Sequence, residues 1–176
     1  HQGVLFLDEM PEFDRNVLEV LREPLESGVI NISRINKNAQ YPARFQLIAA
    51  MNPCPCGYLG SVNRSCKCSV NQIQRYQNKL SGPLLDRIDL HISVPDLPQS
   101  FYLDDKYPAE TSEEVKKRII RTRDIQISRQ KGLNSMLNED NIKKYCKLPV
   151  EAKPLLEKAI KKFQLSARAY NRVLKI

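Results

Sequence analysis

The stretch Gly3–Phe13, GVLFLDEMPEF, decides how the rest of the chain is interpreted. It opens with five apolar residues, a pattern typical of a strand buried on both faces of a sheet. Two adjacent carboxylates, Asp8 and Glu9, follow this run. Open α/β sheets bind ligands beyond the carboxyl ends of their strands. We therefore interpret Asp8 as an acid for Mg²⁺ beside nucleotide phosphates and Glu9 as the acid that polarises the attacking water. The alternative is a pair of solvated acids, or a cap for the next helix.

Alternating secondary structure is predicted for the first part of the chain. The apolar run Phe45–Met51 predicts a second buried strand, and a third strand is predicted near Leu90–Val94. Between the first two strands we expect a helix that Asp14 caps. A β-hairpin is expected over 29–45, with its turn at 36–38 because Asn-Lys-Asn suits a turn.

Beyond residue 98 the composition becomes helical. Thr111–Glu114 fits a capping box before a long helix, and Asn138 and Ser166 suit the N-caps of later helices. We therefore expect an α/β domain over 1–98 and an all-helical domain over 99–176, cut short at its end.

The net charge and the hydropathy of the chain limit the kinds of molecule that it is expected to bind. Residues 1–98 carry ten basic and ten acidic side chains, whereas 99–176 carry eighteen basic and ten acidic, so the net charge of +8 lies in the second part. This excess predicts a polyanionic partner such as DNA; a solvated, lysine-rich helical surface is the alternative. No apolar run approaches the roughly 20 residues that cross a bilayer, and no export signal is visible. We expect a cytoplasmic protein with no membrane partner.

Four of the five cysteines gather in one loop, as Cys54-x-Cys56 and Cys66-x-Cys68. Four thiolates can enclose one structural Zn²⁺ in a tetrahedron, although C-x-C is a weaker signal than C-x₂-C. Free thiols in an open loop are the alternative. Disulfides are not expected in the absence of an export signal.

Three more polar residues extend the chemistry of the acidic pair. Asn52 follows the second buried strand, where its amide can position the same water or contact the γ-phosphate. Arg87 precedes the predicted third strand, and its guanidinium suits charge that develops on a transferring phosphoryl group. Arg168 lies in the first turn of the last predicted helix. Taken singly, Asn52 is explained by a turn, Arg87 by a surface ion pair and Arg168 by a solvated helix. Together with the acidic pair, and in this order along the chain, they form a set that less often arises by chance.

Five segments together resemble the magnesium chelatase-like branch of the AAA+ ATPases, and within it the competence-associated YifB/ComM-type subfamily. Gly3–Phe13 looks like the Walker B segment, and Leu21–Arg34 looks like the helix and hairpin insert. Ala49–Gly60 looks like sensor 1 with the cysteine loop. Ser81–Ile92 looks like the arginine-finger segment, and Ser166–Ile176 looks like the sensor 2 helix. The resemblance covers nearly the whole chain and is weakest over 99–160.

This resemblance implies part of an AAA+ P-loop core with a parallel sheet and a hairpin insert, followed by a helical lid. It implies that Asp8, Glu9, Asn52 and Arg168 serve ATP and Mg²⁺. Arg87 would reach the nucleotide of a neighbouring subunit in a hexameric ring. The phosphate-binding G-x-x-x-x-G-K-[S/T] loop is absent from the sequence, so we expect it upstream and expect these 176 residues alone to be inactive.

The hairpin supplies the predicted contact with DNA. Arg34 and Lys37 flank its expected tip and Arg44 is expected on its return strand, so that hairpins in a ring could hold a phosphate backbone. A solvent-exposed charged turn is the alternative. Relatives of the subfamily suggest helicase or branch-migration work. Two other functions remain open: a chelatase-type metal-insertion or protein-remodelling ATPase, and a non-enzymatic, zinc-dependent nucleic-acid-binding module.

Overall fold

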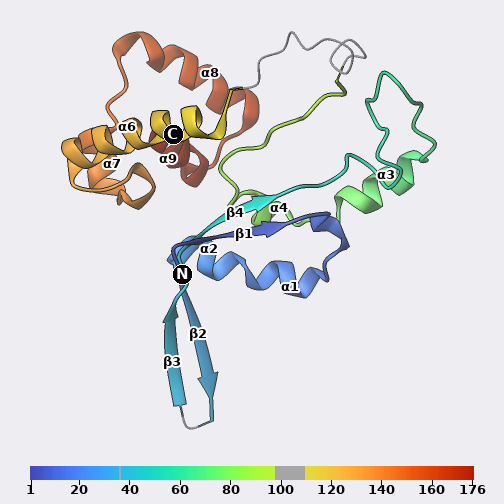
Figure 1. The fold of residues 1–176 in the computed structure, drawn as a ribbon, viewed down its shortest axis with the longest axis horizontal. Helices are drawn as coiled ribbons and strands as arrows, with labels where there is room; N and C mark the ends of the chain where they lie inside the picture. Colours follow the sequence, from blue (N-terminus) through green and yellow to red (C-terminus); the bar gives the residue numbers. More distant parts are fainter. Residues whose placement is uncertain (36, 98–109) are drawn as a thin grey trace. The chain divides into compact units, whose positions relative to one another are not determined.

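The computed structural model describes residues 1–35, 37–97 and 110–176 (Figure 1). The chain separates into two compact units, His1–Leu97 and Pro98–Ile176. The boundary expected between residues 98 and 99 lies outside the described residues.

Two parallel strands form the sheet of the first unit. Strand β1 (Gly3–Leu7) pairs with β4 (Phe45–Ala49) in a register that places Leu7 opposite Ala49. Both strands were predicted from their apolar runs. Their parallel pairing makes this unit a mixed α/β structure and puts both carboxyl ends at the same edge of the sheet.

Two short helices, α1 (Arg15–Val20) and α2 (Arg22–Ser27), follow β1. Asp14 caps α1 as predicted, because its Oδ1 accepts a hydrogen bond of 2.7 Å from the Asn16 N–H. The helix breaks between α1 and α2 because Pro24 has no N–H to donate to the carbonyl four residues earlier. Gly28 then ends α2 in the left-handed conformation, with φ +72°.

A β-hairpin connects α2 to β4. It consists of β2 (Val29–Arg34) and β3 (Lys37–Pro42), antiparallel, and it extends away from the β1–β4 sheet (Figure 1). The expected turn over 36–38 was wrong: Lys37 pairs with Arg34, so Lys37 already belongs to a strand. Residue 36 lies outside the described residues. Arg44 is not on the return strand either, since β3 ends at Pro42.

The helices cover only one face of the sheet. A cluster of buried side chains joins the end of β1 to the helices, and Leu5 and Leu47 pack against it; its members are Leu7, Met10, Leu18, Leu80 and Leu84. On the other face, Val4 is 63% exposed and Phe6 is 58% exposed. The expectation of a strand buried on both faces was therefore wrong for this chain, because no described element covers that second face.

The segment after β4 contains the cysteine loop and two helices. Helix α3 (Val70–Gln77) begins after Ser69, which forms a capping box with Gln72, and α4 (Gly82–Leu85) is a single helical turn. The third strand predicted near Leu90–Val94 is wrong. These residues pair with no strand among the described ones, so Ile92 remains 79% exposed.

The second unit is helical where it is described. Its helices and 3₁₀ turns are α6 (Ser112–Gln130), η2 (Asn134–Met136), α7 (Glu139–Tyr145), η3 (Val150–Ala152), α8 (Lys153–Phe163) and α9 (Ala167–Lys175). The predicted caps are confirmed: Thr111 forms its capping box with Glu114, and Asn138 and Ser166 cap α7 and α9.

Among the described residues, no helix combines the length and the apolar character that crossing a membrane requires.

Candidate functional site

The carboxyl ends of β1 and β4 are tied together one step beyond the strands. Ala50 donates its N–H to the Leu7 carbonyl at 2.9 Å, and Met10 donates its N–H to the Ala50 carbonyl at 3.0 Å. Asp8 and Glu9 lie between these two hydrogen bonds. The backbone of the acidic pair is therefore held against the segment that leads from β4 to Asn52.

A sharp turn at Glu9 separates the two carboxylates. Glu9 adopts a left-handed conformation with φ +49°, which costs a non-glycine residue on the order of 1–2 kcal/mol. Asp8 Oδ1 accepts a hydrogen bond of 2.9 Å from the Glu9 N–H. The short 3₁₀ helix η1 (Met10–Glu12) starts immediately afterwards and is anchored by buried Met10. Both acidic residues remain exposed at the sheet edge.

Tyr76 of α3 joins this edge, and sequence reasoning missed it. The side chain is only 7% exposed, and its hydroxyl lies beside the Asn52 backbone. Burial raises the pKa of Tyr76 above its usual value, and the negative charges of Glu12 and Glu9 raise it further. A tyrosine on the apolar face of a predicted helix was the available signal, because a buried hydroxyl needs a polar partner.

Asn52 itself is exposed at the end of the segment that follows β4. Its Oδ1 lies 3.7 Å from the place that a Cβ on Gly57 would occupy, so the side chain is directed toward the cysteine loop. Gln77 also donates from Nε2 to the Pro53 carbonyl at 3.1 Å. The structure thus connects Asn52 to both the sheet edge and α3.

Arg87 has partners that the sequence did not indicate. Its guanidinium binds Glu26 of α2 and donates to the Pro83 carbonyl at 2.6 Å, and the side chain is 10% exposed. The Nε atom has no hydrogen-bond partner within the described part of the chain. No contact between Arg87 and the acidic pair is formed in this chain. Its action on a neighbouring subunit stays a prediction.

Arg168 belongs to the second unit. It is exposed in the first turn of α9, where Ser166 Oγ accepts a hydrogen bond of 3.2 Å from the Ala169 N–H. Because the two units are not placed relative to one another, its predicted role at the nucleotide stays a prediction.

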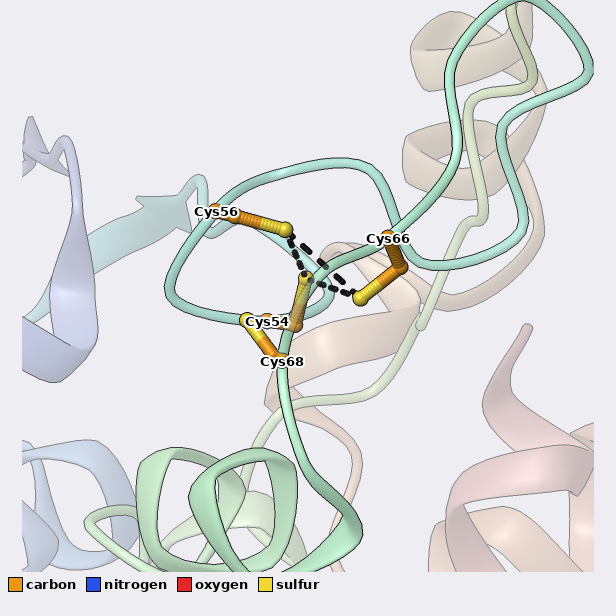
Figure 2. A group of neighbouring side chains, drawn as sticks. All are labelled: Cys54, Cys56, Cys66 and Cys68. Carbon is orange, nitrogen blue, oxygen red and sulfur yellow. Dashed lines mark hydrogen bonds between the residues drawn. The ribbon is translucent and has the colours of Figure 1, made fainter.

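The four loop cysteines converge as their spacing predicted (Figure 2). The Sγ atom of Cys54 lies 3.4 Å from that of Cys56 and 3.7 Å from that of Cys66, and Cys56 and Cys66 are 3.6 Å apart. All four Sγ atoms lie within 4.8 Å of one another, including that of Cys68. Hydrogen bonds from the backbone lower the pKa of Cys56 to about 6, whereas burial raises the pKa of Cys68 to about 12.

Comparison of the chain with models of known protein families gives two matches. Residues 1–101 match the family model described as magnesium chelatase, subunit ChlI, and residues 109–176 match that of the ChlI C-terminal region. The chain belongs to the magnesium chelatase ChlI family. The resemblance predicted from the five segments is confirmed.

Two of the relatives of this ChlI-family chain are similar to it along its whole length, and a third matches about half of it. The chain is 53% identical over 175 residues to the competence protein ComM of Haemophilus influenzae and 48% identical over 177 residues to the YifB protein of Escherichia coli. An MCM-type protein of Methanocaldococcus jannaschii is 31% identical over 98 residues, which is 56% of the chain and 11% of that protein. The matches to ComM and YifB cover 99% and 100% of this chain, respectively, but only 34% of each relative. The chain therefore spans about a third of their length.

In this ChlI-family chain, the predicted DNA contacts divide into two places. Arg34 and Lys37 face each other across the end of the hairpin and are both exposed. Arg44 lies at the base instead, between β3 and β4, where its Cγ is 2.8 Å from the position that a Cβ on Gly28 would take. The structure therefore brings Arg34 and Lys37 together and does not bring Arg44 to them.

Proposed function

We propose that this ChlI-family chain supplies the hydrolytic side of the nucleotide site in an AAA+ ATPase. One observation carries the proposal: the parallel pairing of β1 with β4 puts the acidic pair and Asn52 past the carboxyl ends of adjacent strands. Open α/β sheets bind their ligands there. The family match supports the same function, since its members include the chelatase subunit ChlI.

The side chains at this edge fit Mg²⁺ and nucleotide phosphates. Mg²⁺ prefers oxygen ligands and commonly takes one or two carboxylates together with phosphates and water. Asp8 offers such an oxygen, because its carboxylate is exposed and the hydrogen bond from the Glu9 N–H engages Oδ1. When bound, the metal would neutralise charge on the phosphates.

Glu9 and Asn52 would act on the attacking water. The exposed Glu9 carboxylate can accept a proton from that water, and the Asn52 amide can orient it by a hydrogen bond. The left-handed turn at Glu9 directs the second acid differently from Asp8, which lets two adjacent carboxylates serve two purposes. Tyr76 would hold the Asn52 backbone in place.

Arg87 and Arg168 would contribute to the nucleotide site from outside the sheet edge. In the proposed hexameric ring, Arg87 leaves Glu26 and stabilises charge on the nucleotide of the neighbouring subunit. Arg168 would contact the nucleotide from the helical lid.

DNA is the load that the charge distribution favours. Arg34 and Lys37 project at the end of a hairpin, and the excess of basic residues lies in the second part of the chain. Phosphate contacts of this kind are insensitive to base sequence and are weakened by salt. A chelatase-type load is the second candidate, because it is the activity named in the family's description.

The hydrolytic role is tested in the full-length protein with Glu9→Gln. We expect the rate of ATP hydrolysis to fall by about 10²–10⁴-fold, because a general base contributes this much, while ATP affinity stays within about two-fold. Glu12→Gln is the matched control, since Glu12 pairs with Lys79 and should leave the rate unchanged. Equal rates for wild type and Glu9→Gln would contradict the proposal.

The load is tested with Arg34→Glu combined with Lys37→Glu. We expect weaker DNA binding, a salt dependence with a slope lower by about 2, and loss of DNA stimulation of the ATPase. Arg15→Glu with Arg75→Glu removes the same charge elsewhere on the first unit. An ATPase that DNA does not stimulate, in wild type as in both variants, would favour a chelatase-type load.

A further inference from the structure

The cysteine loop has no apolar core of its own to hold it in shape. Residues 54–68 contain no helix or strand, and the apolar side chains in their middle point outward: Val62 is 87% exposed and Leu59 is 38% exposed. Cys54, in contrast, is completely buried. A segment of this length without a core needs a cross-link or a metal to order it.

The positions of the thiols fit a tetrahedral ion. Zn–S bonds of about 2.3 Å place the sulfurs of a tetrahedron about 3.8 Å apart. The sulfur separations among Cys54, Cys56 and Cys66, which are 3.4, 3.6 and 3.7 Å, are close to this value. An iron–sulfur cluster spreads its cysteines over several irons and needs a wider arrangement.

The surroundings of the sulfurs resemble the second shell of a metal site. The backbones of Tyr58 and Lys67 donate hydrogen bonds to the Cys56 sulfur, as backbone groups do around ligating thiolates. The outer part of the loop is held separately. Asp96 accepts hydrogen bonds from the Ser61 hydroxyl and, at 3.2 Å, from the Val62 N–H.

The geometry points to one structural Zn²⁺ bound by Cys54, Cys56, Cys66 and Cys68, which locks the segment carrying Asn52 to the start of α3. Four protein ligands leave no open position, so the ion would stabilise structure and take no part in catalysis. This assignment does not rest on the proposed ATPase activity, because the metal and the order of the loop can both be measured without it.

The connection to Asn52 follows from where the ligands lie. Cys54 is two residues beyond Asn52, and Cys68 immediately precedes Ser69, the cap of α3. From the other end of α3, Tyr76 and Gln77 return to the backbone of Asn52 and Pro53. The metal would therefore close a ring that runs from the sheet edge through the loop and along α3.

The first experiment measures metal in the full-length protein, purified under reducing conditions without chelators. Elemental analysis should find about one zinc per chain in wild type and in Cys146→Ser, and less than a tenth in Cys68→Ser. Cys146 is the matched control because it lies outside the cluster, at the end of α7. Less than a tenth of a zinc in wild type, disulfides among the four cysteines, or iron with acid-labile sulfide would each overturn the assignment.

The second experiment uses the wild-type protein alone and so does not depend on the folding of a variant. Replacement of zinc by Co²⁺ should produce the absorption of a tetrahedral tetrathiolate site, and an octahedral spectrum would overturn the assignment. Trypsin tests the order of the loop: after zinc removal, cleavage at Arg64 and Lys67 should accelerate at least ten-fold, while cleavage at Arg34 and Lys37 stays constant. Equal acceleration at both places, or none in the loop, would overturn the structural role.

Discussion

All four thiols of the cysteine cluster come from fifteen consecutive residues, whereas Glu9 and Asn52 at the sheet edge are separated by more than forty. The cluster can form as soon as its own loop closes. The sheet edge forms only when β1 and β4 pair, and two of its proposed helpers, Arg87 and Arg168, lie elsewhere in the chain. A local site and a dispersed one therefore lie side by side in the first unit, joined at Asn52.

Because one site is local and the other is dispersed, we expect substitutions in the two sites to have different effects. A change at the sheet edge should abolish chemistry without disturbing the loop, because the acids and Asn52 are exposed and hold little of the core. A change in the loop should reach the edge through Asn52 and α3. We therefore expect substitutions in the loop to impair the sheet edge, and substitutions at the edge to leave the loop intact.

Next to the loss of Glu9, the largest effect is expected from Asn52→Ala. The rate of ATP hydrolysis by the full-length protein should fall by about 10²-fold, as it does when an amide that stabilises a transition state is removed. Zinc content should not change. Asn71→Ala, which removes an exposed amide from α3, is the control. Loss of zinc in Asn52→Ala would show that the coupling also runs from the edge to the loop.

Glu9→Gly should have opposite effects on activity and stability. Glycine tolerates the left-handed conformation, so the free energy of unfolding should rise by about 0.5–1 kcal/mol while hydrolysis is lost. Lys131→Gly makes the same change at φ +59° in the second unit and should stabilise without loss of activity. Urea denaturation gives the stabilities; a destabilised Glu9→Gly would mean that the turn is not strained.

Ser69→Ala removes the capping box next to Cys68. We expect the free energy of unfolding of the first unit to fall by about 1 kcal/mol and cleavage at Arg64 to increase, because α3 would fray toward the loop. Ser166→Ala removes a cap of the same kind from α9 and should leave cleavage at Arg64 unchanged. Thermal unfolding and timed trypsin digestion measure the two quantities.

The smallest effect on the rate of hydrolysis is expected from Tyr76→Phe, which removes the buried hydroxyl beside the Asn52 backbone. A net loss of about 1 kcal/mol corresponds to a rate about five-fold lower. Because the pKa of Tyr76 is raised in the folded protein, its contribution to stability is complete below the unfolded value near 10 and is lost as pH rises beyond it. Wild type should therefore lose more stability than Tyr76→Phe between pH 9 and pH 11, and identical losses would contradict the raised pKa.

Local patterns could be predicted well from the sequence. The caps at Asp14, Thr111 and Ser166 and the convergence of the cysteines all appear in the structure as expected. Each depends on hydrogen bonds or distances within a few residues. The same reasoning found the two strands and placed Asp8 at the end of the first.

Predictions that depended on distant neighbours were less accurate. An apolar alternation near Ile92 indicated a strand, yet a strand needs a partner, and none of the described strands pairs with it. Arg87 pairs with Glu26, sixty-one residues away, and Arg44 folds toward Gly28; neither contact has a signature in local sequence. Tyr76 escaped notice for the same reason, because its partners belong to other elements.

From the sequence alone one could predict the two parallel strands, the caps of the main helices, the residues that carry the carboxylates, amide and thiols, and the family of the chain, but not that the segment near Ile92 lacks a strand. Which of these groups meet depends on packing: the folded chain aligns the ends of β1 and β4, brings Tyr76 to Asn52, holds Arg87 against Glu26 and, among the described residues, leaves one face of the sheet uncovered. Backbone conformation follows from interactions within a few residues, whereas burial and contact depend on which elements pack together, so only the folded chain reveals them.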